Sequence, residues 1–303
     1  MPTLRARLFR TLLRHSMGRS FRRAGFSVDE LRRLERVLVR SQRPPRGTRI
    51  SSVVVNGLAA EWVIAPGARS RAAILYLHGG AFVMGSPATH RELAARISIA
   101  GKAKVLSLNY RLAPEFPFPA ALYDARAAYH WLLGQGYASD ALAIGGDSSG
   151  AGLALQVLLA LRKEGTSLPC AGFFMSPATD WVNFTGDSFL TRAALDPLLS
   201  PAQTRHTAGL YVGKVARSDP LLCPIHMSLA GLPPIWIQVG DHDILLSDAE
   251  RLARRAIADG VEVEFKIWSG MWHVFQGTVR YVPEARWSLD DLSRFLKERL
   301  SVP

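Results

Sequence analysis

Residues 141–154 read Ala-Leu-Ala-Ile-Gly-Gly-Asp-Ser-Ser-Gly-Ala-Gly-Leu-Ala, a pattern that indicates a strand, a tight turn and a helix. A short apolar run ends at Ile144, and a run of small residues with helical character begins at Gly150. Between them, residues 146–150 match the pattern G-x-S-x-G, whose central serine occupies a tight turn from a strand into a helix. Flanking glycines let neighbouring backbone approach closely, and a helix N-terminus favours developing negative charge. Ser148 is therefore the candidate nucleophile.

Outward from this turn, short apolar runs alternate with longer helical stretches. The runs that predict strands are 52–56, 60–64, 74–77, 104–108, 142–144, 172–175, 235–239 and 261–267. The stretches that predict helices are 90–100, 119–133, 149–163, 247–259 and 288–300. The helix at 247 is expected to start with a capping box of Ser247 and Glu250. This alternation indicates one α/β domain over 50–303, with a mostly parallel sheet and helices on both faces.

The positive charge of the chain is concentrated at its N-terminus. The 303 residues carry a formal net charge of +12, but residues 1–49 hold 14 arginines and only three acids, a local balance of +11. The remainder is close to neutral, so a nucleic-acid-binding protein is not indicated. Arginine alternates with leucine over 4–14, which we interpret as an amphipathic surface or cap helix. A transit peptide and a weak contact with an anionic membrane are the alternatives.

Other protein classes are disfavoured by simple features. No apolar stretch approaches the roughly 18–20 residues of a membrane span, and no signal-peptide core is present, so we expect a cytoplasmic protein. Cys170 and Cys223 lack the spacing of a metal site or a disulfide framework. Residues 180–232 contain many aromatic and leucine residues without a strand pattern. This predicts a helical insertion between two strands, a position at which active-site lids form.

A second motif follows the predicted strand that ends at Leu77. His78-Gly79-Gly80-Ala81-Phe82 places adjacent glycines directly after a buried strand, where backbone N–H groups point freely into a cavity. An acyl-transfer oxyanion needs such fixed donors. We expect the N–H groups of Gly79 and Gly80, with that of Ser149, to form an oxyanion hole. His78 is expected to brace this loop.

These motifs resemble one known family. The motif at 78–82, Tyr110-Arg111-Leu112-Ala113-Pro114-Glu115 and Gly-Asp-Ser-Ser-Gly together resemble the hormone-sensitive-lipase-like esterases (bacterial family IV) of the α/β-hydrolase superfamily, over roughly residues 50–300. The resemblance implies an eight-stranded sheet and a helical cap built from residues 1–49 and the insertion at about 180–232. The chain departs from the family pattern at Ala81 (glycine), Phe116 (often histidine) and Ser149 (often alanine).

A nucleophilic serine needs a base and an acid that orients the base. Eight histidines compete for the first role: His15, His78, His90, His130, His206, His226, His242 and His273. In α/β-hydrolases the chain order is serine, acid, histidine, which leaves His273. For the acid, Asp243 aligns with the family pattern and Asp241 is the second choice. We attribute Asp248 to the helix dipole, and the Asp-His-Asp string gathers too few neighbouring ligands for a metal site.

The resemblance implies a serine carboxylesterase acting on short- to medium-chain esters without a cofactor. The alternatives are an amidase or deacetylase with the same triad and a non-catalytic ligand-binding module; relatives of the latter type lose the histidine that His273 supplies. The resemblance also implies pairing of two copies through an edge strand as one alternative. Residues expected to line the substrate pocket are Phe82, Trp181, Phe184, Leu199, Tyr211 and Val274.

Overall fold

The computed structural model describes residues 1–22 and 27–300 and contains one eight-stranded sheet. Its strands are β1 (Arg49–Val55), β2 (Leu58–Ile64), β3 (Arg69–Leu77), β4 (Ala103–Leu108), β5 (Leu142–Asp147), β6 (Ala171–Met175), β7 (Ile235–Gly240) and β8 (Val263–Trp268). They lie in the order β1-β2-β4-β3-β5-β6-β7-β8. The β1–β2 and β2–β4 pairs are antiparallel and the other pairs are parallel. The predicted fold class, including its N-terminal hairpin, is confirmed.

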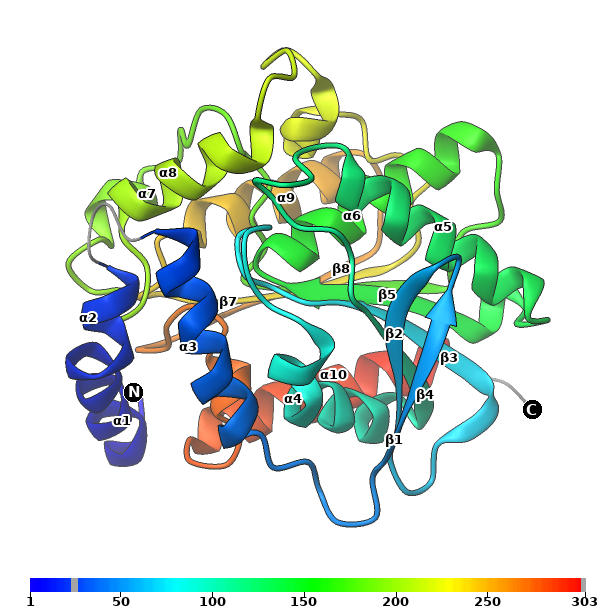
Figure 1. Ribbon diagram of the computed structural model, residues 1–303, viewed down its shortest axis with the longest axis horizontal. Coiled ribbons are helices and arrows are strands. Elements are labelled where there is room, and N and C mark those ends of the chain that lie inside the picture. The colour runs from blue at the N-terminus through cyan, green and yellow to red at the C-terminus, as the bar shows by residue number, and fades with distance from the viewer. Residues whose placement is uncertain (23–26, 301–303) are drawn as a thin grey trace.

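Helices cover both faces of this sheet (Figure 1). They are α1 (Leu4–His15), α2 (Met17–Phe21), α3 (Val28–Ser41), α4 (Pro87–Gly101), α5 (Ala120–Gly134), α6 (Ser149–Glu164), α7 (Ser188–Thr191), α8 (Pro201–Val212), α9 (Leu246–Ala258) and α10 (Pro283–Arg299). One apolar core joins the sheet to α5, α6 and α9, and the other joins it to α4 and α10. Every residue of β5 is buried, because helices pack against it from both sides.

The parallel strands point their carboxyl ends to one edge of the sheet. The turn after β5, the loop after β7 and the loop after β8 therefore leave the sheet side by side, since β5, β6, β7 and β8 are consecutive neighbours. Ligand sites of open α/β sheets form at this edge. β8 is also a terminal strand of the sheet, and its pairing with a second copy stays a prediction.

The start of α9 differs from the sequence prediction. The helix begins at Leu246, and Leu245 at the N-cap makes no side-chain capping bond, so the predicted Ser247–Glu250 capping box is wrong. Ser247 instead exchanges hydrogen bonds with Ser188: the Ser188 amide donates to Ser247 Oγ at 3.1 Å, and the Ser247 amide donates to Ser188 Oγ at 2.8 Å. A tertiary contact with α7 takes the place of the local cap.

Both regions predicted as cap are mainly helical. Residues 1–49 form α1, α2 and α3, while the insertion at 180–232 forms α7, α8 and two short 3₁₀ turns. Figure 1 shows α1, α2 and α3 together at one end of the molecule, next to α7 and α8. Of the helices that the structure describes, none combines the length and apolar composition needed to cross a bilayer.

Candidate active site

Ser148 lies on the sharp turn between β5 and α6. Its backbone has φ 53° and ψ −121°, a conformation that L-residues rarely adopt and that strained functional turns tolerate. The turn fits because Gly146 and Gly150 carry no side chain: a Cβ on either would approach the carbonyl oxygen of Leu77 to 2.3 or 2.0 Å. Only glycine fits at both positions, and the result is a serine side chain projecting above the sheet edge.

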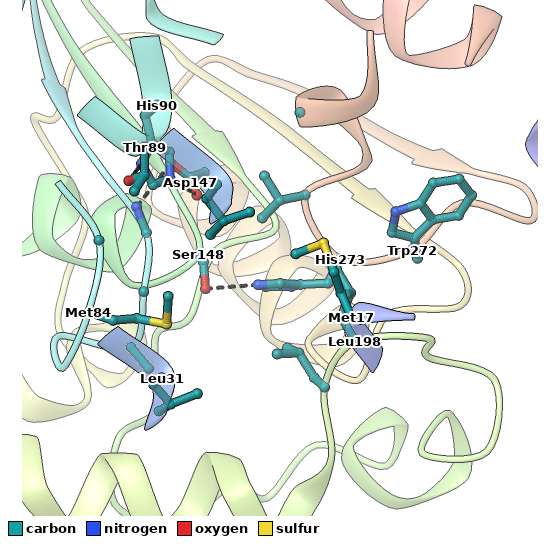
Figure 2. Close-up of a pocket in the computed structure, with 18 of the residues that line it drawn as sticks. Met17, Leu31, Met84, Thr89, His90, Asp147, Ser148, Leu198, Trp272 and His273 are labelled. Atoms are coloured by element: carbon teal, nitrogen blue, oxygen red, sulfur yellow. Dashed lines mark hydrogen bonds and ion pairs between the residues drawn. The ribbon is translucent and has the colours of Figure 1, made fainter. Parts of the chain in front are cut away.

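His273 faces the serine from the loop after β8. Its Nε2 lies 2.8 Å from Ser148 Oγ, as Figure 2 shows. The loop is held by the amide of Val274, which donates to Ser176 Oγ at 3.1 Å. Only 6% of the His273 surface is exposed. Of the eight histidines, the structure brings His273 into hydrogen-bond contact with Ser148.

Asp243 completes this chain of hydrogen bonds. Its Oδ2 lies 3.0 Å from His273 Nδ1, and its Oδ1 accepts the Leu245 amide at 2.9 Å. The carboxylate is fully buried. Because Asp243 bonds Nδ1, the protonated nitrogen of a neutral imidazole faces the acid and the free lone pair of Nε2 faces Ser148. The serine, histidine and acid expected from sequence are therefore brought together.

The two neighbouring carboxylates have other partners. Asp241, the second choice for the acid, accepts the Gly270 amide at 2.6 Å and so braces the start of the histidine loop. Asp248 lies in the first turn of α9, as expected, and it is also buried and accepts the amide of Thr179 at 2.8 Å. It also pairs with Arg251 at 2.7 Å. Its role is to fasten the start of the cap insertion to α9.

The acid stabilises the charged form of the base. Burial by itself lowers the pKa of His273, but the charge and hydrogen bond of Asp243 outweigh it, so the net pKa is raised above 6.5. Asp196 contributes to this rise as a second nearby carboxylate. The charged imidazolium form of His273 is thereby stabilised.

Asp196 is a buried carboxylate that sequence reasoning missed. One of its oxygens accepts the amides of Leu198 at 2.8 Å and Leu199 at 2.9 Å, and the other accepts the amide of Ile244 at 3.1 Å. Burial, and then the charge of Asp243, raise the pKa of Asp196 to about 6. It ties the insertion at 180–232 to the loop that carries Asp243. An aspartate before proline in a loop gives no signal of this role.

The loop at 78–82, where the oxyanion hole is expected, differs from the prediction in one respect. The Gly79 amide donates to Asp147 Oδ1 at 3.1 Å, so this N–H is engaged and the expectation that it faces an oxyanion does not hold. Within the described residues, no protein acceptor receives the amide of Gly80, Ala81 or Ser149. The first two have positive φ, 125° and 54°, which turns the chain sharply at this point. The free donors are therefore shifted by one residue along the loop.

A buried polar cluster holds this loop in place. Asp147 accepts a hydrogen bond from the Tyr76 hydroxyl as well as from Gly79, and its Oδ2 lies 3.6 Å from His90 Nε2 (Figure 2). Burial opposes both charges, but their attraction outweighs it: the pKa of Asp147 is lowered and that of His90 is raised. Burial lowers the pKa of His78 to about 3, so this ring is neutral, and it stacks on Tyr110 at 4.3 Å. Its expected bracing role fits this geometry.

A cavity of about 490 Å³ opens in front of Ser148 and His273. Of the residues expected to line it, Trp181, Phe184, Leu199 and Val274 do so. Phe82 and Tyr211 do not. Both are buried in the main core, where their rings stack with centroids 3.7 Å apart. They support the cavity wall from behind.

Much of the remaining wall comes from the N-terminal helices, whose lining residues were not predicted one by one. They are Phe9, Leu13, Met17, Leu31 and Leu38. Figure 2 shows Met17 and Leu31 on opposite sides of the Ser148–His273 pair. The four-residue spacing of Phe9 and Leu13 places them on one helix face, a signal that sequence could have supplied. Only the tertiary structure shows that this helix face lines the cavity.

A small set of polar contacts fastens these helices. Arg32 of α3 donates to both carboxylate oxygens of Glu115, at 2.7 and 2.8 Å, and to the carbonyls of Val83 and Ala113. In α1, Arg10 donates to the Gly270 carbonyl at 3.1 Å, next to the histidine loop. The N-terminal helices are thus directly connected to the loop that carries His273.

The site contains no arrangement suited to a metal ion. Within residues 1–22 and 27–300, no group of three or more histidine, cysteine, aspartate or glutamate side chains is placed to hold one. His242, the centre of the Asp-His-Asp string, lies beside Arg10, which donates to its Nδ1. Burial and the charge of Arg10 lower the pKa of His242, so its ring is a neutral hydrogen-bond acceptor.

Comparison with known proteins gives a consistent result. Residues 74–277 match a family described as alpha/beta hydrolase fold. An acetyl-hydrolase of Streptomyces hygroscopicus is 42% identical over 245 residues, 81% of each chain. The carboxylesterase/phospholipase LipF of Mycobacterium tuberculosis is 32% identical over 267 residues, 84% of this chain and 71% of the relative.

Solved structures agree over nearly the full length. An esterase from the bacterial hormone-sensitive lipase family superposes with a TM-score of 0.93 at 38% identity, covering 99% of this chain and 100% of that one. EstE5, in a crystal soaked with p-nitrophenyl butyrate, superposes with a TM-score of 0.92 at 38% identity and the same coverage. The similarity includes the N-terminal helices as well as the sheet.

Proposed function

This chain is a carboxylic ester hydrolase of the α/β hydrolase family, in its hormone-sensitive-lipase-like group, and we propose that it acts on short- to medium-chain esters through an acyl-enzyme on Ser148. The observation that carries the mechanism is the unbroken chain of contacts Ser148–His273–Asp243, at 2.8 and 3.0 Å, on the wall of an apolar cavity. A serine hydroxyl with a positioned base is the arrangement that acyl transfer requires.

In the proposed first half-reaction, Ser148 Oγ attacks the ester carbonyl while His273 Nε2 takes its proton. The carbonyl oxygen becomes negative and accepts hydrogen bonds from the amides of Gly80, Ala81 and Ser149. Asp243 stabilises the imidazolium. When the tetrahedral intermediate collapses, the bond to the alcohol breaks and the alcohol leaves with the proton from His273.

In the second half-reaction, water repeats the chemistry in place of serine. His273 removes a proton from the water, which attacks the acyl carbon, and the same amides hold the oxyanion. Collapse releases the carboxylic acid and returns the proton to Ser148. Every proton passes through His273, so the cycle needs no cofactor.

The size of the cavity supports substrates of modest length. At about 490 Å³ it lies in the lower half of the range of about 300–1,000 Å³ seen for small-molecule sites. Trp181, Phe184 and Leu199 give it apolar walls that suit an acyl chain. The similarity to an acetyl-hydrolase supports the short end of the acyl range.

A hydrolysis profile over p-nitrophenyl acetate, butyrate, octanoate and palmitate tests this proposal. We expect kcat/KM to peak at butyrate or octanoate and to fall sharply at palmitate, and a fluorophosphonate to label wild type but not Ser148→Ala. A peak at palmitate would contradict the proposed chain length. Faster turnover of p-nitroacetanilide than of p-nitrophenyl acetate would favour the amidase alternative, and binding of all esters without turnover would favour the ligand-binding module.

A further inference from the structure

The outer face of α1 carries a row of exposed leucines. Leu4, Leu8 and Leu12 are 69%, 63% and 63% exposed. They are spaced four residues apart, so they lie above one another on one side of the helix. Single exposed leucines are ordinary on protein surfaces, but three aligned on one helix form a continuous apolar stripe.

The same helix cannot hide this stripe by rotating inward. Its opposite face is already occupied: Ala6 is fully buried, and Phe9 stacks on Tyr281 with ring centroids 5.2 Å apart. The start of the helix is fixed by Thr3, whose hydroxyl donates to Glu284 of α10 at 3.0 Å. The leucines therefore face outward in the folded protein, on a helix that lies at one end of the molecule in Figure 1.

Positive charge borders the stripe. At 100° per residue, Arg5 and Arg7 fall on opposite sides of the leucine row. Both are exposed, and neither has an acidic partner within the described residues. A row of exposed leucines between unpaired arginines is complementary to a partner that offers both apolar groups and negative charge.

This chemistry selects one occupant. A nucleic acid would satisfy the arginines but leave the leucines in water, and a second copy of the same face would bring arginines against arginines. The surface of an anionic phospholipid bilayer offers acyl chains below and phosphate groups at the level where arginines beside an embedded helix would lie.

We propose that the outer face of α1 docks this hydrolase on anionic phospholipid surfaces, with Leu4, Leu8 and Leu12 inserted at the headgroup boundary. Because Phe9 and Leu13 on the inner face of the same helix line the substrate cavity, docking places a wall of that cavity at the lipid surface. Esters dissolved in the bilayer would then meet the cavity without first crossing bulk water. The docking itself does not depend on the proposed ester specificity.

Co-sedimentation of the full chain with vesicles tests the docking. Vesicles of phosphatidylcholine are compared with vesicles in which roughly one third of the lipid is phosphatidylglycerol. We expect wild type to bind the anionic vesicles and to be released by high salt. Leu4→Ser/Leu8→Ser/Leu12→Ser is expected to lose binding at least tenfold, and Arg5→Gln/Arg7→Gln about fivefold per arginine.

Matched controls lie on the catalytic domain. Ile257→Ser/Tyr123→Ser removes two exposed apolar side chains elsewhere, and Arg71→Gln/Lys297→Gln removes two exposed charges elsewhere; neither is expected to change vesicle binding. Turnover of soluble p-nitrophenyl acetate, measured for every variant, reports intact folding separately from docking. Absence of wild-type binding to anionic vesicles, or equal binding by the triple leucine variant, would overturn the proposal. So would a leucine variant that changes from dimer to monomer in sedimentation analysis with vesicle binding unchanged, because the face would then be an interface between copies.

Discussion

The carboxyl edge of the sheet and the N-terminal helices meet at one cavity, but they are built differently. At the sheet edge, Ser148, Asp243 and His273 come from loops after three parallel strands, and the acid and the base are buried and hydrogen-bonded. The N-terminal helices are basic and expose a leucine row. They pack on the core through Ala6, Leu13 and Leu31, and polar contacts such as the paired hydrogen bonds of Arg32 with Glu115 fasten them.

The sheet edge therefore carries the groups of the proposed reaction, and the N-terminal helices shape the pocket that selects the substrate. The proposed chemistry rests on strand ends inside the core, whereas a large part of the pocket wall comes from N-terminal helices that contact the core with one face. A change in the first region is expected to alter kcat for every ester. A change in the second is expected to alter the dependence on acyl length, and each prediction below tests this division.

The largest effect is expected at the nucleophile. Ser148→Ala removes the attacking oxygen, and kcat for p-nitrophenyl butyrate is expected to fall about 10⁴-fold or more, with residual turnover from the oxyanion donors. Thermal unfolding supplies the control. Ser148→Gly is equally inactive but relaxes the positive φ at this position, so it is expected to unfold at a higher temperature than Ser148→Ala. Equal activity of Ser148→Ala and wild type would remove the serine from the mechanism.

Asp243→Asn is expected to lower kcat about 10³- to 10⁴-fold, because the amide no longer holds His273 in the required tautomer. The pH profile adds a second readout. The base must be neutral, so activity falls as pH drops through the pKa of His273, which Asp243 raises above 6.5. The acid limb of kcat/KM is expected above pH 6.5 in wild type and at lower pH in the variant. An unshifted limb would show that another group controls it; Asp241→Asn is the matched control.

A smaller effect is expected from the carboxylate that joins the two regions. Asp196→Asn keeps an acceptor for Leu198 and Leu199 but presents an NH₂ group to the Ile244 amide, and kcat is expected to fall about tenfold. Because burial raises its pKa to about 6 in the folded state, ionising Asp196 costs stability, which is lost as pH rises from about 4 to about 6.

Urea unfolding of wild type and Asp196→Asn between about pH 4 and about pH 6 tests whether the free energy of unfolding falls as the pH rises. The stability of wild type relative to Asp196→Asn is expected to decline from pH 4 to pH 6 and to level off above it. A constant difference would mean that Asp196 titrates normally, and an unchanged kcat would mean that its bond to the acid loop does not position Asp243.

The smallest effect is expected at the fastening of α3. Arg32→Gln cannot span Glu115 and the two carbonyls together, so the wall around Leu31 loosens. KM for p-nitrophenyl octanoate is expected to rise several-fold, with kcat for the acetate nearly unchanged. Arg33→Gln, one residue away and without an acidic partner among the described residues, is the matched control. An equal loss with acetate and octanoate would contradict the division between chemistry and selection.

Sequence reasoning succeeded where local pattern and chain order carry the information. The G-x-S-x-G turn needs glycine on both sides for steric reasons that hold in any context, so Ser148 could be assigned before the fold was known. It was less successful where a residue has several neighbours to choose from. The amide of Gly79 was expected at the oxyanion, but Asp147 accepts it, and no spacing rule shows that an aspartate 68 residues away will do so.

The same limit explains Phe82, Tyr211 and the helix start at Leu246. An aromatic side chain in a loop, such as Phe82, or on a helix, such as Tyr211, can face a cavity or the core with equal local cost, and here both rings stack on each other in the core. The local sequence allows a capping box at Ser247, but in the folded protein Ser247 exchanges hydrogen bonds with Ser188 instead. Local rules list the partners that are available, and packing chooses among them.

Three features of this protein follow from the sequence alone: an alternating α/β domain, a candidate nucleophile on a glycine-flanked turn, and a basic, amphipathic segment at its start. Only the tertiary structure decided which face of that segment lines the cavity, which amides remain free for an oxyanion, and that Asp196 joins the cap to the acid loop. The reason is physical. Periodicity and steric requirements act between residues close in the chain, whereas burial and hydrogen-bond competition depend on groups that folding brings together from far apart.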